Sequence, residues 1–204
     1  MRTKIRQNNN FVLRTALNLI KYNLMIKTCI IFLLFFLPSL LLAQDVKNTS
    51  YTTTTGERVL RFETTIPVDK EEAWKLLASA DGWKKWAAPV VSIDLKVGGV
   101  ILTNYDTTKT VNDSSTIRLP IINYIEGEML TLRVELNNSF SIDAQKEDQN
   151  LQEIIQIIPV GKNKTRIVSS MIGWGIGEHW DKTYDFFSKG NEWTYEQIAK
   201  LFKK

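Results

Sequence analysis

The sequence predicts an α+β fold in which one strand and two short helices precede about six antiparallel strands and a long C-terminal helix. Three observations support this prediction. Apolar and polar residues alternate in several short segments, the closing segment has the apolar stripe of a helix, and no helical segment interrupts the run of strands. Parallel strands would need helical connections, so the sheet is expected to be antiparallel.

Residues 1–43 have the pattern of a signal peptide. The uncharged run "IIFLLFFLPSLLLA", residues 30–43, is shorter than the roughly 18 to 20 residues that a membrane-spanning helix needs. We expect cleavage after Ala43 and a mature protein that is periplasmic or secreted. Leu41 is a poor residue at the third position before the cut, which leaves an uncleaved membrane anchor as the alternative.

The leader contains a second possible start. Met25 begins a compact signal of ordinary length, and residues 1–24 are then an upstream extension. A mitochondrial-type presequence is another interpretation of this arginine-bearing, acid-free stretch, but the long apolar run that follows favours export. Cys29, the single cysteine, lies within the leader, so the mature chain is expected to have no disulfide and no thiolate chemistry.

The net positive charge of the chain comes from its leader, residues 1–43. The formal net charge is +4, yet residues 1–43 contain six basic residues and no acidic one, which leaves 20 basic and 22 acidic residues in the remainder. We therefore expect no nucleic-acid partner, and contact with a membrane only through an uncleaved leader. Composition and length predict one domain over residues 57–204, after a flexible tether rich in threonine at residues 44–56.

The domain begins with a strand and two helices. In "RVLRFETTI", residues 58–66, apolar and polar residues alternate as in a strand with one buried face. Asp69 stands three residues before Glu72, the spacing of a capping box that starts an amphipathic helix. Asp81 is expected to cap a second short helix within "DGWKKWAAP", residues 81–89.

The remaining elements are strands and one helix. An antiparallel meander is predicted for the segments "VSIDLKV", "VILTNYD", "TIRLPIINYI", "MLTLRVEL", "LQEIIQIIPV" and "TRIVSSMIGW". The last segment, "GEHWDKTYDFFSKGNEWTYEQIAKLFKK", places its apolar residues near one helical stripe. Gly190 weakens this helix by roughly 1 kcal/mol relative to alanine, which permits a bend without forcing one.

Four segments in this order resemble the START-like SRPBCC superfamily, in the branch named after the activator of the heat-shock ATPase. They are "IPVDKEEAWKLLASADGWKKWAAP", "DLKVGGV", "IINYIEGEMLTLRV" and "TRIVSSMIGWGIGEHWDKTYDFFSKGNEW", and together they span roughly residues 57–203. The resemblance implies a helix-grip fold, in which a curved antiparallel sheet wraps around the long C-terminal helix and leaves a cavity between them. It also implies that the two short helices close one end of the sheet.

Seven aromatic residues are candidates for lining this cavity. Two lie three positions apart on one face of the second short helix, two flank the glycine-rich turn before the last helix, two lie near strand ends, and one lies on the apolar stripe of the last helix. For each of them the alternative is a structural role in the core. The candidates are Trp83, Trp86, Tyr105, Tyr124, Trp174, Trp180 and Tyr184.

Groups suited to catalysis are sparse. His179 is the only histidine, and its place at a helix start favours a solvent-facing or capping role. Glu126 and Glu128 lie on a predicted hairpin turn, where carboxylates are usually solvated. We therefore predict no catalytic residue, no metal site and no cofactor.

Three functions remain open from the sequence. The favoured one is an exported protein that binds a small apolar molecule in the cavity. The alternatives are a cavity enzyme of the cyclase or hydrolase type, which the superfamily also contains, and a co-chaperone-like interaction module, against which export counts. A buried carboxylate in the cavity would favour the enzyme, an apolar cavity the carrier, and a filled cavity with an exposed apolar patch the protein partner.

Overall fold

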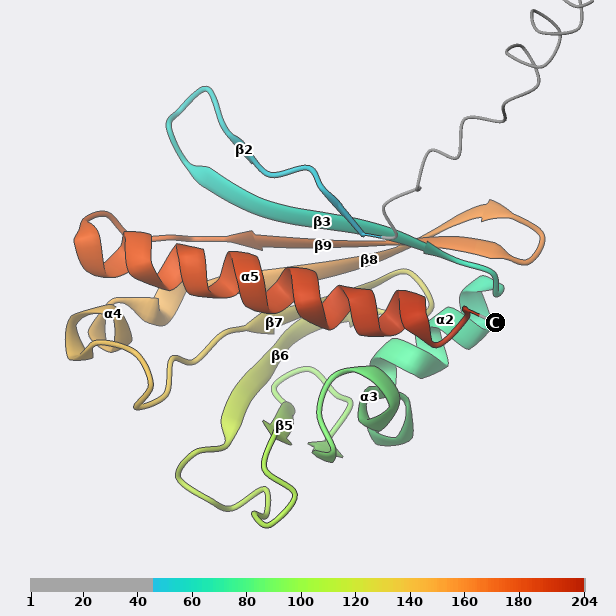
Figure 1. Ribbon diagram of the computed structural model, residues 1–204, viewed down its shortest axis with the longest axis horizontal. Coiled ribbons are helices and arrows are strands. Elements are labelled where there is room, and N and C mark those ends of the chain that lie inside the picture. The colour runs from blue at the N-terminus through green and yellow to red at the C-terminus, as the bar shows by residue number, and fades with distance from the viewer. Residues whose placement is uncertain (1–45, 204) are drawn as a thin grey trace, which may run out of the picture. The chain divides into compact units, whose positions relative to one another are not determined.

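The computed structural model describes residues 46–203, so the predictions about a signal peptide concern residues outside this range. Within it the chain has the predicted α+β order (Figure 1). Nine strands of the described residues form one antiparallel sheet in the order β1-β3-β9-β8-β7-β6-β5-β4, with β2 paired to β3 off this path. The sheet curves around the long C-terminal helix α5, which is the helix-grip arrangement (Figure 1).

The elements follow one another with short connections for the most part. They are β1 (Val46–Asn48), β2 (Tyr51–Thr52), β3 (Arg58–Ile66), α2 (Lys70–Ala78), α3 (Ala80–Trp86), β4 (Val90–Ile93), β5 (Val100–Asn104), β6 (Ile117–Ile125), β7 (Met129–Arg133), α4 (Ile142–Lys146), the 3-10 turn η1 (Asp148–Asn150), β8 (Gln152–Gly161), β9 (Lys164–Ile172) and α5 (Glu178–Lys200). In the described part of the chain no helix is both long and apolar enough to cross a membrane.

The first two strands correct the prediction of a flexible tether over residues 44–56. β1 pairs with β3 through Val46 opposite Thr64, and β2 pairs with it through Tyr51 opposite Val59. Val46 is almost completely buried. An edge strand forms backbone hydrogen bonds with a single neighbour. One buried side chain is therefore enough to hold it on the sheet, and its otherwise polar sequence does not show the alternation by which a strand is predicted.

Helices α2 and α3 follow each other directly. The Asp69 side chain accepts a hydrogen bond of 2.9 Å from the backbone N–H of Glu72, as the capping spacing predicts. The cap of α3 corrects the prediction, because Ser79 and not Asp81 accepts from the backbone N–H of Gly82, at 3.0 Å. Asp81 lies in the first turn, where its charge faces the positive end of the helix dipole.

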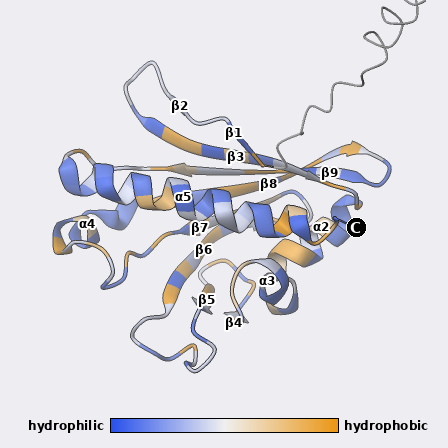
Figure 2. Cartoon of the chain, viewed as in Figure 1, coloured by the Kyte–Doolittle hydropathy of each residue, from blue (hydrophilic) through white to orange (hydrophobic). Residues whose placement is uncertain are grey.

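The inner face of the sheet and the apolar stripe of α5 form the core. On β8 and β9 the odd-numbered residues point inward, and Ile155, Ile157, Ile167 and Met171 are buried among them. Figure 2 shows hydrophilic and hydrophobic residues interspersed along α5, as expected of an amphipathic helix. The helix runs through Gly190 without interruption.

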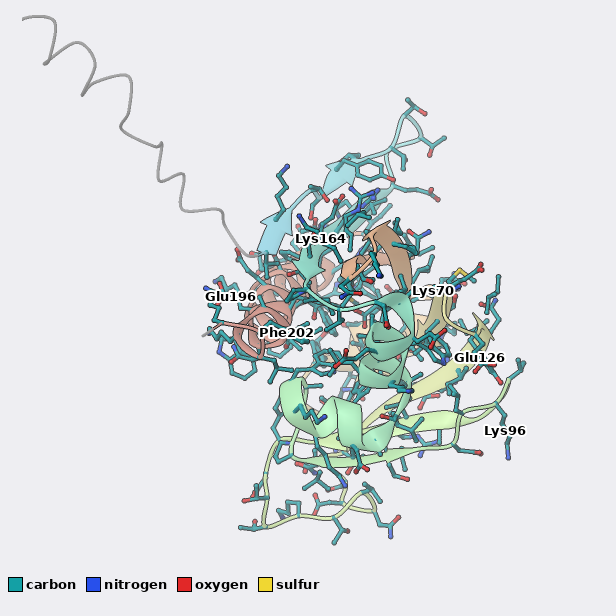
Figure 3. The ribbon with its side chains drawn as sticks, turned by 90° about the vertical axis from the view of Figure 1, so that its right-hand side faces the viewer. Lys70, Lys96, Glu126, Lys164, Glu196 and Phe202 are labelled. Atoms are coloured by element: carbon teal, nitrogen blue, oxygen red, sulfur yellow. The ribbon has the colours of Figure 1, made fainter. Side chains whose placement is uncertain are left out.

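The two ends of α5 have different neighbours. Figure 3 looks along α5 from its C-terminal end, where Leu201 and Phe202 lie beside residues of α2 and α3. This is the closure of one sheet end that the family resemblance implies. At the other end α5 contacts α4, a short helix that the sequence analysis does not predict and that is capped by the Ser141 hydroxyl.

Candidate functional site

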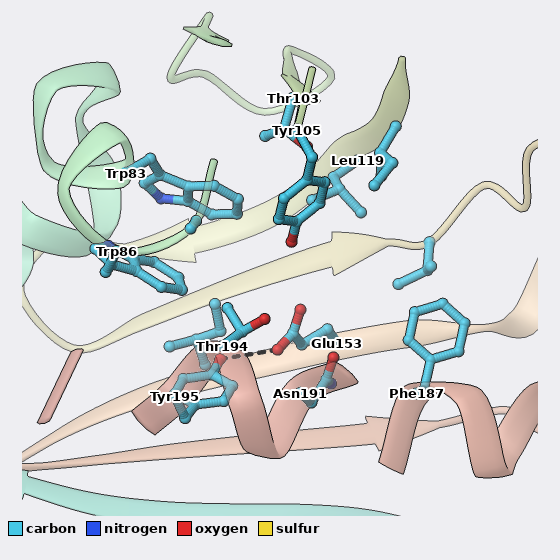
Figure 4. Close-up of a pocket in the computed structure, with 14 residues that line it drawn as sticks. Trp83, Trp86, Thr103, Tyr105, Leu119, Glu153, Phe187, Asn191, Thr194 and Tyr195 are labelled. Atoms are coloured by element: carbon cyan, nitrogen blue, oxygen red, sulfur yellow. Dashed lines mark hydrogen bonds between the residues drawn. The ribbon is translucent and has the colours of Figure 1, made fainter. Parts of the chain in front are cut away.

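A cavity of about 100 Å³ lies between the inner face of the sheet, helix α3 and the C-terminal half of α5 (Figure 4). Its lining is mainly apolar and aromatic, with a few polar side chains from β5, β8 and α5. The lining residues are Trp83, Trp86, Ala87, Thr103, Tyr105, Ile117, Leu119, Val134, Glu153, Ile155, Phe187, Asn191, Thr194 and Tyr195.

Three aromatic rings form one wall of the cavity. The rings of Trp83 and Trp86 are 5.1 Å apart between centroids, and Trp86 stacks on Tyr195 at 6.0 Å. Both tryptophans are only 5% exposed, and their indole N–H groups donate to the backbone carbonyls of Leu77 and Leu76. Lining the cavity and filling the core were the two alternatives for these tryptophans. They are compatible, because the same rings fill the core under α2 and face the cavity.

Glu153 is the single acidic residue on the cavity wall. It extends from β8 with its carboxylate directed into the space (Figure 4). Its Oε1 atom accepts hydrogen bonds from the hydroxyls of Ser169, at 2.6 Å, and Tyr195, at 2.8 Å. The structure shows no hydrogen-bond partner for Oε2 among residues 46–203. Burial raises the pKa of the Glu153 carboxyl above its usual value, and the two hydrogen bonds offset part of that rise.

Two tyrosines flank this carboxylate. Tyr195 is almost completely buried, and burial together with the charge of Glu153 raises its pKa well above the usual value. Tyr105 is 52% exposed as a whole residue, but its hydroxyl points inward between Thr194 and Glu153 (Figure 4). Burial of that hydroxyl raises the pKa of Tyr105, and the charge of Glu153 adds to the rise. Tyr105 therefore covers the mouth of the cavity, and both hydroxyls stay protonated near neutral pH.

Three of the seven predicted aromatic candidates line this cavity, namely Trp83, Trp86 and Tyr105. Tyr124 does not, because its ring stacks on Trp74 of α2 at 6.1 Å and supports that helix. The other three candidates, Trp174, Trp180 and Tyr184, pack together at the N-terminal end of α5. The reason is distance along the helix, since residues 184 and 195 are separated by about 16 Å at 1.5 Å per residue.

The packed group at the N-terminal end of α5 is a second aromatic cluster. We define it as Trp174, Trp180, Tyr184, Phe187, Phe140 and Phe186. The Trp180 side chain is completely buried, and an added Cβ at Gly175 would lie 2.0 Å from its indole nitrogen, so only glycine permits this packing. Phe187 belongs to both this cluster and the cavity wall.

His179 does not cap α5, in contrast to one of the predicted roles. Its Nε2 atom lies 3.3 Å from Oε2 of Glu147, the same oxygen that accepts a 2.8 Å hydrogen bond from the indole of Trp180. These hydrogen bonds from Trp180 and His179 lower the pKa of the exposed Glu147 carboxyl. The histidine thus helps to fasten the loop after α4 to the start of α5. Among the described residues, no cluster of three or more His, Cys, Asp or Glu side chains could hold a metal ion.

The sequence analysis missed Glu153 and the polar residues of α5 that line the cavity, Asn191, Thr194 and Tyr195. A signal for Glu153 is present in "LQEIIQIIPV", because it shares the inward parity of Ile155 and Ile157 on the strand. A charged residue on the apolar face of a strand is costly to bury without a partner, and it indicates a polar site in the core.

The curved sheet, the enclosing helix and the cavity between them define a START-like SRPBCC protein. The chain belongs to the family described as activator of Hsp90 ATPase homolog 1-like protein, whose model matches residues 67–203. No curated protein is similar enough in sequence to count as a relative of this chain.

Solved structures share this fold at low sequence identity. The Aha1 dimer from Colwellia psychrerythraea has a TM-score of 0.53 at 15% identity and covers 71% of this chain and 92% of its own. A Mesorhizobium loti protein has a TM-score of 0.56 at 14% identity, covering 71% and 96%. CalU16 from Micromonospora echinospora has a TM-score of 0.55 at 10% identity, covering 79% and 76%. At these identities the likeness shows the fold alone.

Proposed function

We propose that this is an exported protein that binds a small, largely apolar ligand in the cavity between the sheet and α5. The observation that carries the proposal is the space of about 100 Å³ beside the rings of Trp83, Trp86 and Tyr195. Protein cores are normally packed to crystal density with few voids larger than a water molecule. The space is smaller than the roughly 300 to 1,000 Å³ of most small-molecule sites, but its apolar and aromatic lining with a few polar groups is typical of them.

The volume limits the part of the ligand that fits inside. A cavity of roughly 150 Å³ accommodates benzene, so a cavity of about 100 Å³ holds on the order of four non-hydrogen atoms. A larger ligand must extend through the mouth and displace Tyr105, which is 52% exposed. We therefore expect a compact group inside and any longer tail outside.

Binding is tested by native mass spectrometry and by tryptophan fluorescence of the purified protein. We expect a copurified small molecule, or a change in emission when a compact apolar probe such as cyclopentane is added. A Trp86→Phe variant should lose most of the emission change, while Trp193→Phe should keep it, because Trp193 lies on the exposed side of α5. No copurified molecule and no response to any probe would contradict the proposal.

Export is tested separately. If the apolar run of residues 30–43 is a cleaved signal, N-terminal sequencing of the secreted protein should begin at or near Gln44. An intact leader recovered in the membrane fraction would support the anchor instead.

A cavity enzyme is the second candidate, and Glu153 is the observation that favours it. A carboxyl with a raised pKa, hydrogen-bonded to Tyr195 and facing a cavity, has the environment of a general acid or base. Turnover in a screen of small esters and cyclisable ketones should then fall at least about 100-fold in Glu153→Gln. Turnover that survives this change would remove Glu153 from the chemistry and leave the binding function.

The co-chaperone alternative is not adopted. Its expected features were a filled cavity together with an exposed apolar patch, and the space beside Trp86 is unfilled. An exported protein would also be separated from an ATP-driven partner in the cytoplasm.

A further inference from the structure

We propose that the cavity selects a small organic cation, an aliphatic ammonium group held between the Glu153 carboxylate and the aromatic wall. The inference rests on the proposed ligand-binding function and names the chemical class of the ligand. It goes beyond the expectation of a purely apolar molecule, because the contacts on the cavity wall are not purely apolar.

The charge of the wall is the first step. Among residues 46–203, the lining contains one carboxyl group, Glu153, and no lysine, arginine or histidine. Nearby arginines on the sheet face away from the cavity, as shown by Arg61 and Arg166, which both lie beside Glu63 on the opposite face. A buried carboxylate without a cationic neighbour is unfavourable, and a ligand that supplies the missing positive charge removes this penalty.

The hydrogen bonds of Glu153 are the second step. Ser169 and Tyr195 both donate to Oε1, so one oxygen is held in place. This leaves Oε2 as the acceptor that faces the cavity (Figure 4). A primary ammonium group carries three N–H donors and no acceptor, which is the complement of such an oxygen.

The remaining polar side chains continue this pattern. Asn191 donates from Nδ2 to the sulfur of Met171, at 3.1 Å, and its amide oxygen points toward Glu153 (Figure 4). The Thr194 hydroxyl lies on the same side of the cavity as Asn191, because both residues belong to α5. A second and a third N–H of the ligand therefore have oxygen acceptors within the same space.

The aromatic wall is the third step. The neighbouring rings of Trp83 and Trp86 lie across the cavity from the carboxylate, with Tyr105 above, while Tyr195 lies beside the carboxylate through its hydrogen bond to Oε1 (Figure 4). A cation within about 6 Å of the face of a tryptophan or tyrosine ring is attracted by its quadrupole, and the attraction strengthens when water is excluded. Several rings facing one acidic group form the kind of cage that binds ammonium ions.

The test uses three probes with the same number of non-hydrogen atoms and opposite or no charge. They are isopropylammonium, 2-propanol and acetate, which all match the estimate of about four non-hydrogen atoms inside the cavity. Affinity is measured on the purified protein at pH 7.5 by saturation-transfer NMR and tryptophan emission. We expect isopropylammonium to bind about tenfold more tightly than 2-propanol, and acetate to bind most weakly.

Glu153→Gln is the diagnostic variant, since glutamine can still accept hydrogen bonds from Ser169 and Tyr195. It should reduce the preference for isopropylammonium over 2-propanol to about twofold or less. Glu126→Gln is the matched control, because it removes the same charge from an exposed hairpin turn away from the cavity. The control should keep the full tenfold preference.

A pH series on the unmodified protein keeps the proposal falsifiable if Glu153→Gln fails to fold. The titratable side chains on the wall are Glu153, Tyr105 and Tyr195, and the two tyrosines stay neutral at acidic pH. Affinity for isopropylammonium should therefore fall as acid protonates Glu153, while affinity for 2-propanol stays constant.

The outcomes separate this inference from the proposed function. Equal binding of isopropylammonium and 2-propanol, or tighter binding of acetate, would overturn the cation inference and leave ligand binding intact. Binding of cyclopentane, with no binding of isopropylammonium, would also overturn the cation inference and leave ligand binding intact. A protein that binds none of these probes would contradict the proposed function itself.

Discussion

The two ends of α5 bury aromatic residues in opposite ways. At the N-terminal end, Trp180 is fully buried in the second aromatic cluster, and its indole N–H is bonded to Glu147. At the C-terminal end, Trp86 and Tyr195 are almost as deeply buried, yet they border a cavity of about 100 Å³. The first end is filled by its aromatic rings, and the second leaves a cavity unfilled.

The two glutamates at these ends sharpen the contrast. Glu147 and Glu153 each have one carboxylate oxygen that is hydrogen-bonded to two neighbours. The pKa of the exposed Glu147 is lowered by its hydrogen bonds, whereas the pKa of Glu153 is raised by burial in spite of its hydrogen bonds. Access to water, and not the number of hydrogen bonds, decides the direction of the shift.

The largest effect is expected at the packed end. Trp180→Ala should lower the free energy of unfolding by about 3 to 5 kcal/mol, because it removes a completely buried ring from a filled cluster. Urea denaturation followed by circular dichroism measures the loss. Trp193→Ala on the same helix is the control, since Trp193 is 52% exposed and its loss should cost about 0.5 kcal/mol or less. Similar losses of stability for both variants would contradict the tight packing assigned to Trp180 in the second aromatic cluster.

Trp86→Ala should have a smaller effect on stability and a larger one on binding. One side of this ring already faces empty space, so we expect a loss of about 2 to 4 kcal/mol in the free energy of unfolding. Probe affinity, measured by titration where the variant is folded, should fall at least about tenfold. An unchanged affinity would show that Trp86 is core filler without contact to the ligand.

The two glutamates should give opposite pH dependences of stability. The raised pKa of Glu153 means that the folded state binds its proton more tightly, so stability relative to Glu153→Gln is highest below pH 4.5 and falls as pH rises through the raised value. The lowered pKa of Glu147 acts in reverse, so stability relative to Glu147→Gln is present above pH 4.5 and is lost as pH falls. Urea titrations from pH 3 to pH 8 measure both differences. Slopes of the same sign would refute the environments assigned to these two side chains.

The smallest effect concerns the start of α3, which carries two rings of the cavity wall. Ser79→Ala should cost about 1 kcal/mol of stability, because the Ser79 hydroxyl is the N-cap. Asp81→Ala should cost only about 0.3 kcal/mol, from lost interaction with the helix dipole. Thermal unfolding of both variants compares them, and the reverse order would restore Asp81 as the cap.

Sequence patterns were sufficient for the order of elements from β3 to α5, apart from the short helix α4 and the 3-10 turn η1. The alternation in residues 58–66, the Asp69 cap and the apolar stripe of the last helix are local properties, with partners at most a few residues away, and the structure confirms each of them. The family resemblance supplied the helix-grip arrangement, which the curved sheet around α5 confirms. The lack of local periodicity also explains why β1 and β2 were not predicted. A strand that is held by a single neighbour needs almost no alternation of apolar and polar residues of its own.

The site required the tertiary structure. By sequence alone, each of the seven aromatic candidates could line a cavity or fill the core, and no local pattern distinguished the two roles. Helix α5 places Trp180 and Tyr195 too far apart to share one cavity, and the loop after α4 brings Glu147 to the first of them. Glu153 and Tyr195 are 42 residues apart in the chain and meet only because β8 lies beneath α5. The sequence determined which residues of a strand or helix point toward the core, because that direction depends on the periodicity of the element. Which of those residues enclose a cavity was decided by how distant elements pack, and no local pattern contains that information.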